Sequence, residues 1–166
     1  LVAIEGMGPP PAMIKDRLAM PTHERLRLWV DELRTLSGRA PRRYQSLEEA
    51  FQRMQTENPH LTADQARHLT IHGSNQNEDG TYSWKFDNYV RSFSPVGLAF
   101  EQTYDLYRRI QCPTLLVRGM ESWATDPSTD GRSEHFEHAS VANIEGAGHW
   151  VHHDQLDEFL ELVKGF

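Results

Sequence analysis

The chain has 166 residues, with 17 Lys and Arg against 24 Asp and Glu, and a formal net charge of −7. This balance excludes an ordinary nucleic-acid binder, because neutralising phosphates requires clustered Lys and Arg. No apolar run approaches the ~18 residues that a membrane-spanning helix needs, so we expect no membrane partner. Cys112 is the only cysteine, which excludes a disulfide framework and suits a reducing compartment. We therefore expect a cytoplasmic protein.

Residues 1–9 predict a core strand that leads into a loop. The run Leu-Val-Ala-Ile-Glu is apolar up to Glu5, and Gly6, Gly8 and a group of prolines follow it. A short apolar run that ends in such residues is typical of a buried strand, because proline cannot continue a regular element.

Residues 10–111 predict a mostly helical segment. Leu26, Trp29, Val30 and Leu33 recur at the spacing of one helix face. The segments 46–49 and 62–65 fit capping boxes, and 82–86 alternates in the manner of a short strand with one aromatic face. A connection of roughly a hundred residues is too long for an ordinary loop, so we expect a cap or lid.

Residues 112–166 predict a change to alternating strands and helices. An apolar strand is expected at 113–119, a helix at 130–138, a second strand at 141–146 and a final helix at 154–164. This order is typical of an α/β fold with a parallel sheet. With the strand at the start of the chain, it gives three parallel strands with flanking helices and a helical cap insertion.

The three predicted strands end in residues that suit a hydrolytic relay. Glu5 follows the first strand, Glu121 follows the second, and His149 lies in the turn Gly-Ala-Gly-His after the third. Sites in open parallel sheets form beyond the carboxyl ends of the strands. A histidine can shuttle a proton there while a carboxylate orients it.

Several segments together resemble one superfamily. The strand 112–119 followed by Gly146-Ala-Gly-His149 looks like the C-terminal part of an α/β-hydrolase. The opening Leu-Val-Ala-Ile-Glu-Gly-Met-Gly-Pro looks like the strand after the nucleophile elbow, and 77–87 is similar to the cap of the serine hydrolase-like branch. The resemblance covers nearly the whole chain.

The resemblance implies a nucleophile that this chain does not carry. The family's nucleophile sits in Gly-x-Ser-x-Gly on a strand-to-helix turn, and that motif occurs nowhere in the 166 residues. We therefore expect a missing N-terminal half of the same fold to supply it. The segment alone is expected to be inactive.

The resemblance also implies roles for particular residues. His149 matches the catalytic histidine. The family usually places the acid three residues after the glycine that ends the preceding strand, and that position is Ser122 here. Glu121 lies one residue earlier, and a one-residue deletion in the loop would let its longer side chain reach the histidine, so Glu121 is the expected acid. Glu5 is the alternative, because some branches, such as haloalkane dehalogenases, carry the acid after the earlier strand. Asp126 is a further candidate.

Aromatic residues are the candidates for substrate binding. Trp123 and Trp150 flank the expected catalytic loops. Trp84 and Phe86 lie in the cap segment, with Tyr89 and Phe93 nearby, and the alternative role of these four is the core of the cap.

The sequence predicts neither a metal site nor a cofactor. His149, His152 and His153 lie close together, and two further histidines stand three residues apart at 135 and 138. No His-Glu-x-x-His motif and no phosphate-binding glycine motif accompany them.

The expected function is hydrolysis of an ester, lactone or similar carbonyl substrate through a nucleophile, acid and histidine triad, with a small and apolar substrate. One alternative is an epoxide or haloalkane hydrolase with an Asp nucleophile. A non-catalytic hydrolase-like protein that binds a ligand is the other.

Overall fold

In a computed structural model the chain divides into two compact units, residues 1–20 with 96–166, and residues 21–95. Residues 1–92 and 94–166 are described, without the side chains of residues 88 and 91. Helices α1 (Pro11–Ala19) and α5 (Phe100–Arg108) belong to the first unit. The insertion expected at 10–111 therefore includes segments of the first unit at both of its ends, and the second unit covers only residues 21–95.

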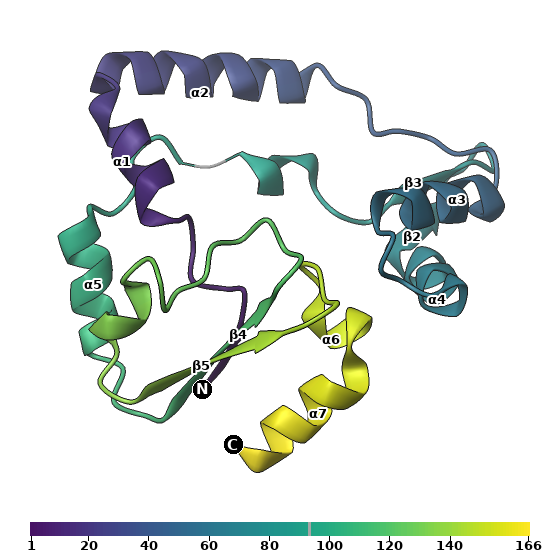
Figure 1. The fold of residues 1–166 in the computed structure, drawn as a ribbon. Coiled ribbons are helices and arrows are strands. Elements are labelled where there is room, and N and C mark those ends of the chain that lie inside the picture. The colour runs from purple at the N-terminus through teal and green to yellow at the C-terminus, as the bar shows by residue number, and fades with distance from the viewer. Residues whose placement is uncertain (93) are drawn as a thin grey trace. The chain divides into compact units, whose positions relative to one another are not determined.

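A parallel sheet forms the centre of the first unit (Figure 1). Its strands are β1 (Val2–Ile4), β4 (Thr114–Gly119) and β5 (Ala139–Ile144), in the order β1-β4-β5. The expected α/β fold with three parallel strands is confirmed. Because all three strands run the same way, the residues that follow them gather at one edge of the sheet.

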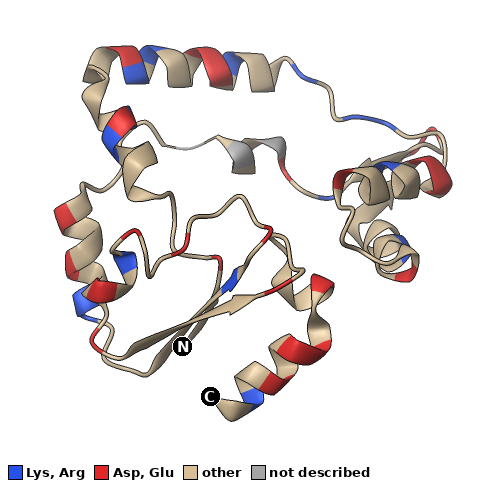
Figure 2. Ribbon diagram, viewed as in Figure 1, with Lys and Arg blue, Asp and Glu red and all other residues tan. Residues whose placement is uncertain are grey.

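One face of this sheet carries the core of the first unit. Leu115 and Val117 of β4 and Ile144 of β5 are almost fully buried, together with Ala147 and Val151. Helix α6 (Val151–Asp154) leads into α7 (Leu156–Gly165), whose apolar stripe packs against this cluster through Phe159, Leu162 and Val163. The acidic residues of α7 lie outside this apolar stripe (Figure 2). The amphipathic helix expected at 154–164 is therefore present.

The helix expected at 130–138 is reduced to one 3₁₀ turn, η2 (Arg132–His135). Gly131 enters it in the left-handed region with φ of 85°. The Asp130 carboxylate accepts hydrogen bonds from both the backbone N–H and Nε of Arg132. These local bonds hold the segment in a turn, in competition with a regular helix.

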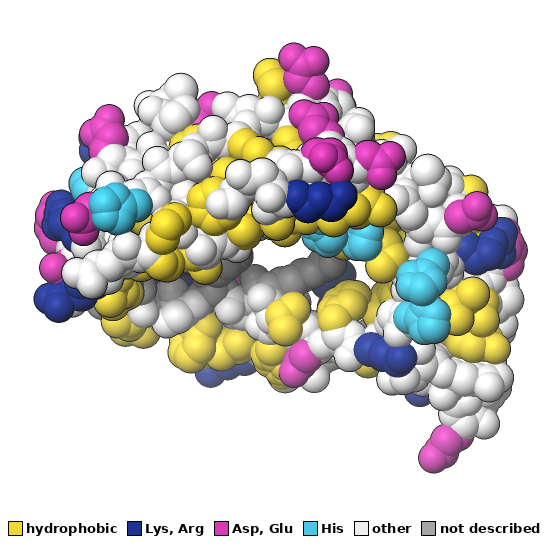
Figure 3. All heavy atoms as spheres, turned by 90° about the horizontal axis from the view of Figure 1, so that it is seen from below, with side chains coloured by type: hydrophobic (Ala, Val, Ile, Leu, Met, Phe, Trp, Pro, Cys, Tyr) yellow, Lys and Arg dark blue, Asp and Glu magenta, His cyan; other side chains and the backbone are white. Residues whose placement is uncertain are grey.

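The second unit contains the remaining elements, which are α2 (Thr22–Ser37), α3 (Leu47–Glu57), α4 (Ala63–Gly73), β2 (Ser74–Gln76), β3 (Tyr82–Trp84) and η1 (Asn88–Arg91). The expected capping box at 62–65 is complete, whereas at 46–49 the Glu49 carboxylate accepts from Gln45 instead of the N-cap. No residue of helix α2 is fully buried, and on its apolar face Trp29 and Leu33 are partly buried whereas Leu26 is exposed. Apolar and charged side chains are intermixed on the surface in Figure 3.

An ion pair between Arg132 and Asp130 ties the loops of the first unit together. The Arg132 side chain is 6% exposed, and it also donates to the carbonyls of Gly8 and Thr125. Burial by itself raises the pKa of Asp130, but hydrogen bonds from Arg132 and Thr125 outweigh it and hold the pKa below its usual 3.8.

We expect Asp130→Asn to destabilise the protein by about 3 kcal/mol, because it leaves a buried guanidinium without its carboxylate. The pKa of Asp130 is lowered on folding, so the pair stabilises the protein above the usual Asp pKa. That contribution disappears as the pH falls through the lowered value. Thermal melts of wild type and variant should therefore differ at neutral pH and converge in acid. Asp105→Asn is the control, because its pair with Arg109 is exposed and should contribute little; equal losses in both variants would contradict the expectation.

Candidate active site

Glu5 stands at the carboxyl end of β1 in a strained backbone conformation. Its N–H still donates to the Val117 carbonyl at 2.9 Å, which is the last bond of the strand pair. Its φ of 49° lies in the left-handed region, at a cost of about 1 kcal/mol for a residue with a Cβ. Its side chain is 1% exposed. A buried, strained carboxylate of this kind is a mark of a functional site.

Three donors converge on the Glu5 carboxylate. The Gly119 N–H donates to Oε1 at 2.9 Å, and the Ser122 hydroxyl donates to Oε2 at 2.5 Å. Nδ1 of His149 lies 2.5 Å from the same Oε2. An ionised carboxylate only accepts hydrogen bonds, so Nδ1 of the neutral imidazole carries the proton. Nε2 is then the nitrogen that can accept a proton from a reacting group.

Two hydrogen bonds hold the loop that carries His149, at the two residues just before the histidine. Asp154 accepts a hydrogen bond from the Gly148 N–H at 2.8 Å, and the Glu121 N–H donates to the Ala147 carbonyl at 2.9 Å. The loop passes so close to the end of β4 that a Cβ on Gly119 would lie 2.2 Å from the Gly148 oxygen. Only glycine at 119 allows this approach, which brings the His149 loop beside the Glu5 carboxylate.

His149 remains accessible on one side. Its side chain is 43% exposed, although the Glu5 carboxylate that it contacts is buried. The ring centroid of Trp123 lies 5.0 Å from that of His149, and the two planes differ by 33°. The imidazole is thus oriented by Glu5 at one edge and contacted by Trp123, while it can still reach solvent or a substrate.

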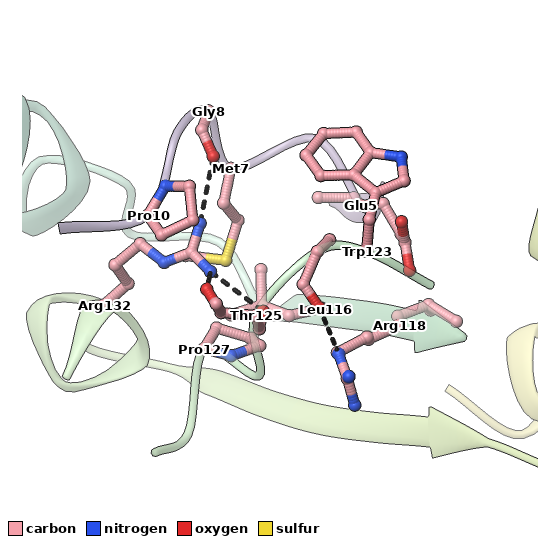
Figure 4. A pocket seen from close by; sticks show the side chains of 13 residues that line it. Glu5, Met7, Gly8, Pro10, Leu116, Arg118, Trp123, Thr125, Pro127 and Arg132 are labelled. Atoms are coloured by element: carbon pink, nitrogen blue, oxygen red, sulfur yellow. Dashed lines mark hydrogen bonds between the residues drawn. The ribbon is translucent and has the colours of Figure 1, made fainter. Parts of the chain in front are cut away.

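A pocket lies beside Glu5 and Trp123 (Figure 4). Glu5 and Trp123 stand at one end of it, and Arg132 stands at the other. Most of the lining side chains between them are apolar, including Met7, Pro10 and Leu116. The nitrogens of Arg132 donate to Asp130, Gly8 and Thr125, so all three already have hydrogen-bond partners within the protein.

The sequence pattern of the alpha/beta hydrolase family matches residues 1–162. The chain belongs to the alpha/beta hydrolase family. The strand ends described above are therefore those of an alpha/beta hydrolase, and the resemblance seen in the sequence is confirmed at the level of the superfamily.

Known alpha/beta hydrolases resemble the chain over much of its length. The mouse (Mus musculus) sn-1-specific diacylglycerol lipase ABHD11 is 29% identical over 90 residues, which are 52% of this chain and 28% of the lipase. The M. tuberculosis esterase Rv0045c has a TM-score of 0.69 and 22% identity, covering 99% of this chain and 52% of that one. The thioesterase domain from the curacin biosynthetic pathway has a TM-score of 0.69 at 19% identity, covering 86% and 50%. The chain thus spans about half the length of these solved structures.

The acid beside the histidine is Glu5, not the expected Glu121. Nδ1 carries a single hydrogen, and the contact with Glu5 uses it. Glu121 is exposed, and the carboxylate of Asp126 accepts from Ser128 and Asn143 instead. The preference for Glu121 assumed that the acid must follow β4, whereas the geometry favours the alternative at the end of β1. The catalytic role of each residue stays a prediction.

The other expected site residues are distributed over both units. Trp123 lines the pocket, and the half-buried Trp150 contacts His153 at the start of α6. In the second unit the half-buried Trp84 donates from Nε1 to the hydroxyl of the buried Tyr44, and Phe86 is 47% exposed. Tyr89 is 45% exposed, and Phe93 lies outside the described residues.

Sequence reasoning missed the two groups that hold Glu5, the Ser122 hydroxyl and the Gly119 amide. The available signal was the serine at the usual position of the acid. Within the described residues, no group of three or more His, Cys, Asp or Glu side chains could hold a metal ion. None of the helices described is both long and apolar enough to span a membrane.

Proposed function

We propose that the protein containing this chain hydrolyses an ester, lactone or similar carbonyl substrate through a triad of which His149 and Glu5 are two members. The observation that carries the proposal is the hydrogen bond between His149 Nδ1 and the buried Glu5 carboxylate. It is the pairing that a hydrolytic relay requires, because it fixes the tautomer and stabilises the imidazolium.

In this mechanism Nε2 of His149 removes the proton of a serine hydroxyl as its oxygen attacks the substrate carbonyl. The imidazolium then gives that proton to the leaving alcohol as the tetrahedral intermediate collapses to an acyl-enzyme. Water attacks the acyl-enzyme with the same help from His149, which releases the acid product. Throughout the cycle the Glu5 carboxylate stays ionised and balances the charge on the ring.

The nucleophile and the oxyanion-binding amides belong to the proposed N-terminal half of the fold. Two observations support this partner. Within the described residues β1 pairs only with β4, which leaves its other edge open to a further strand. The solved relatives are about twice as long as the part that this chain covers.

The single cysteine, Cys112, supports a reducing compartment, so the proposal includes a cytoplasmic location.

The substrate is proposed to be a small apolar molecule. The pocket beside Glu5 supports this, because its walls are mostly apolar side chains, the buried Arg132 is paired with Asp130, and Arg118 donates to the Ala124 carbonyl. Trp123, which also contacts His149, would place the apolar part of the substrate next to the reacting carbonyl.

The position of the acid favours one second candidate. An acid after the strand that corresponds to β1 is also the arrangement implied for haloalkane dehalogenases. If the nucleophile is an aspartate, His149 would activate water against an ester intermediate, and the protein would open epoxides or remove halide. The residue at the nucleophile elbow decides between the two reactions.

The test is hydrolysis of simple aryl esters by the full-length protein. We expect His149→Ala to lower kcat at least about 10³-fold, because both proton transfers pass through Nε2. His138→Ala is the control, because that exposed imidazole lies outside the relay and should leave turnover unchanged. The present chain, expressed without the N-terminal half, should be inactive. Undiminished turnover in a folded His149→Ala protein would contradict the proposal.

A further inference from the structure

The Ser122 hydroxyl makes two hydrogen bonds in the site, one as donor and one as acceptor. Its hydroxyl lies 2.5 Å from Oε2 of Glu5, which is also the oxygen that contacts His149. The same hydroxyl oxygen accepts a hydrogen bond from the Ala124 N–H at 3.1 Å. A hydroxyl has one hydrogen, and the bond from Ala124 leaves that hydrogen directed at Glu5.

The Glu5 carboxylate could otherwise turn about its last torsion, because that torsion is broad in glutamate. The Gly119 N–H holds Oε1, and Ser122 holds Oε2 on the side of the histidine. With both oxygens held, the plane of the carboxylate is fixed. Oε2 is then kept within 2.5 Å of Nδ1, and a hydrogen bond to an ionised acceptor is stronger than one between neutral groups.

We propose that Ser122 is a positioning residue of the relay, which acts on His149 through Glu5 and does not itself touch the substrate. This inference rests on the proposed function. It explains why a serine stands where this family usually carries its acid. With the carboxylate supplied from β1, the residue at the end of β4 contributes the hydroxyl that orients it.

The test is Ser122→Ala in the full-length protein, with kcat, KM, melting temperature and the NMR signal of the His149 Nδ1 proton as readouts. We expect kcat to fall about tenfold with KM unchanged, because one charge-assisted hydrogen bond is lost from the relay. The Nδ1 proton should shift and exchange faster with water. Ser122→Thr keeps the hydroxyl and should restore both kcat and the proton signal.

Ser128→Ala is the matched control, because Ser128 donates to the Asp126 carboxylate in the same loop, at 2.6 Å. It should change neither kcat nor the Nδ1 proton. If Ser122→Ala does not fold, Ser122→Cys replaces it, since a thiol is a weak donor of similar size.

An unchanged kcat and Nδ1 proton in Ser122→Ala would overturn the inference. So would a loss of kcat that follows the melting temperature and that Ser122→Thr does not restore. The Nδ1 proton also separates this inference from the proposed function. If His149→Ala keeps its turnover, the proposed function fails, whereas the proton signal still shows whether Ser122 orients the pair.

Discussion

Replacing Glu5 by glutamine is expected to lower kcat by about 10³- to 10⁴-fold with little change in KM, as loss of the orienting carboxylate does in hydrolytic triads. Glutamine keeps the size of the side chain but cannot balance an imidazolium. Its amide N–H can also donate to Nδ1, which favours the tautomer with the proton on Nε2, and that nitrogen then cannot accept a proton from the nucleophile. The measurement is steady-state hydrolysis of an aryl ester by the full-length variant.

Glu121→Gln is the matched control for this prediction. It makes the same chemical change one strand away, at the exposed residue that the sequence favoured as the acid. Its kcat should stay within about twofold of wild type, because substitutions of exposed side chains outside the site usually have small effects. If Glu121→Gln were the inactive variant and Glu5→Gln the active one, the assignment of the acid to β1 would be wrong.

Gly119→Ala is expected to have the largest effect on stability. The new Cβ would lie 2.2 Å from the Gly148 oxygen and 2.4 Å from the Ala147 oxygen. Both contacts are to backbone, so the His149 loop would have to move away from β4. That movement would break the bond from the Gly119 N–H to Glu5 and expose part of the core. We expect a loss of more than about 3 kcal/mol, or no folded protein.

Gly97→Ala provides the comparison, because a Cβ at that glycine would meet nothing within 4 Å. Its melting temperature should stay close to that of wild type, while that of Gly119→Ala falls or no cooperative transition is seen. Equal melting temperatures in the two variants would show that the loop relaxes freely, against the tight approach described here.

Local patterns predicted the elements that bury a regular apolar face. The strand at 113–119 and the helix at 154–164 each carry such a face, and β4 and α7 bury it in the same core. The helix expected at 130–138 is absent because the local bonds between Asp130 and Arg132, the bond from Arg132 to Gly8 and a left-handed Gly131 decide that segment. None of these is visible as a periodicity.

The site could be predicted only in part, for a physical reason. His149 lies in a glycine-rich turn whose composition is readable in the sequence. The choice between Glu5 and Glu121 depends on a left-handed backbone at Glu5 and on the approach of the His149 loop to Gly119. Both are three-dimensional facts that residue spacing does not encode. The sequence showed Ser122 only as a departure from the family pattern, and the structure shows that its hydroxyl donates a hydrogen bond to Glu5.

The central claim, that Glu5 orients His149 through Nδ1, is tested most directly by the tautomer of His149. Long-range ¹H–¹⁵N NMR of the full-length protein, at a pH where the ring is neutral, distinguishes a protonated Nδ1 from a protonated Nε2. We predict the Nδ1-protonated form in wild type and its loss in Glu5→Gln. A ring protonated on Nε2 in wild type, or a tautomer that Glu5→Gln leaves unchanged, would contradict the account.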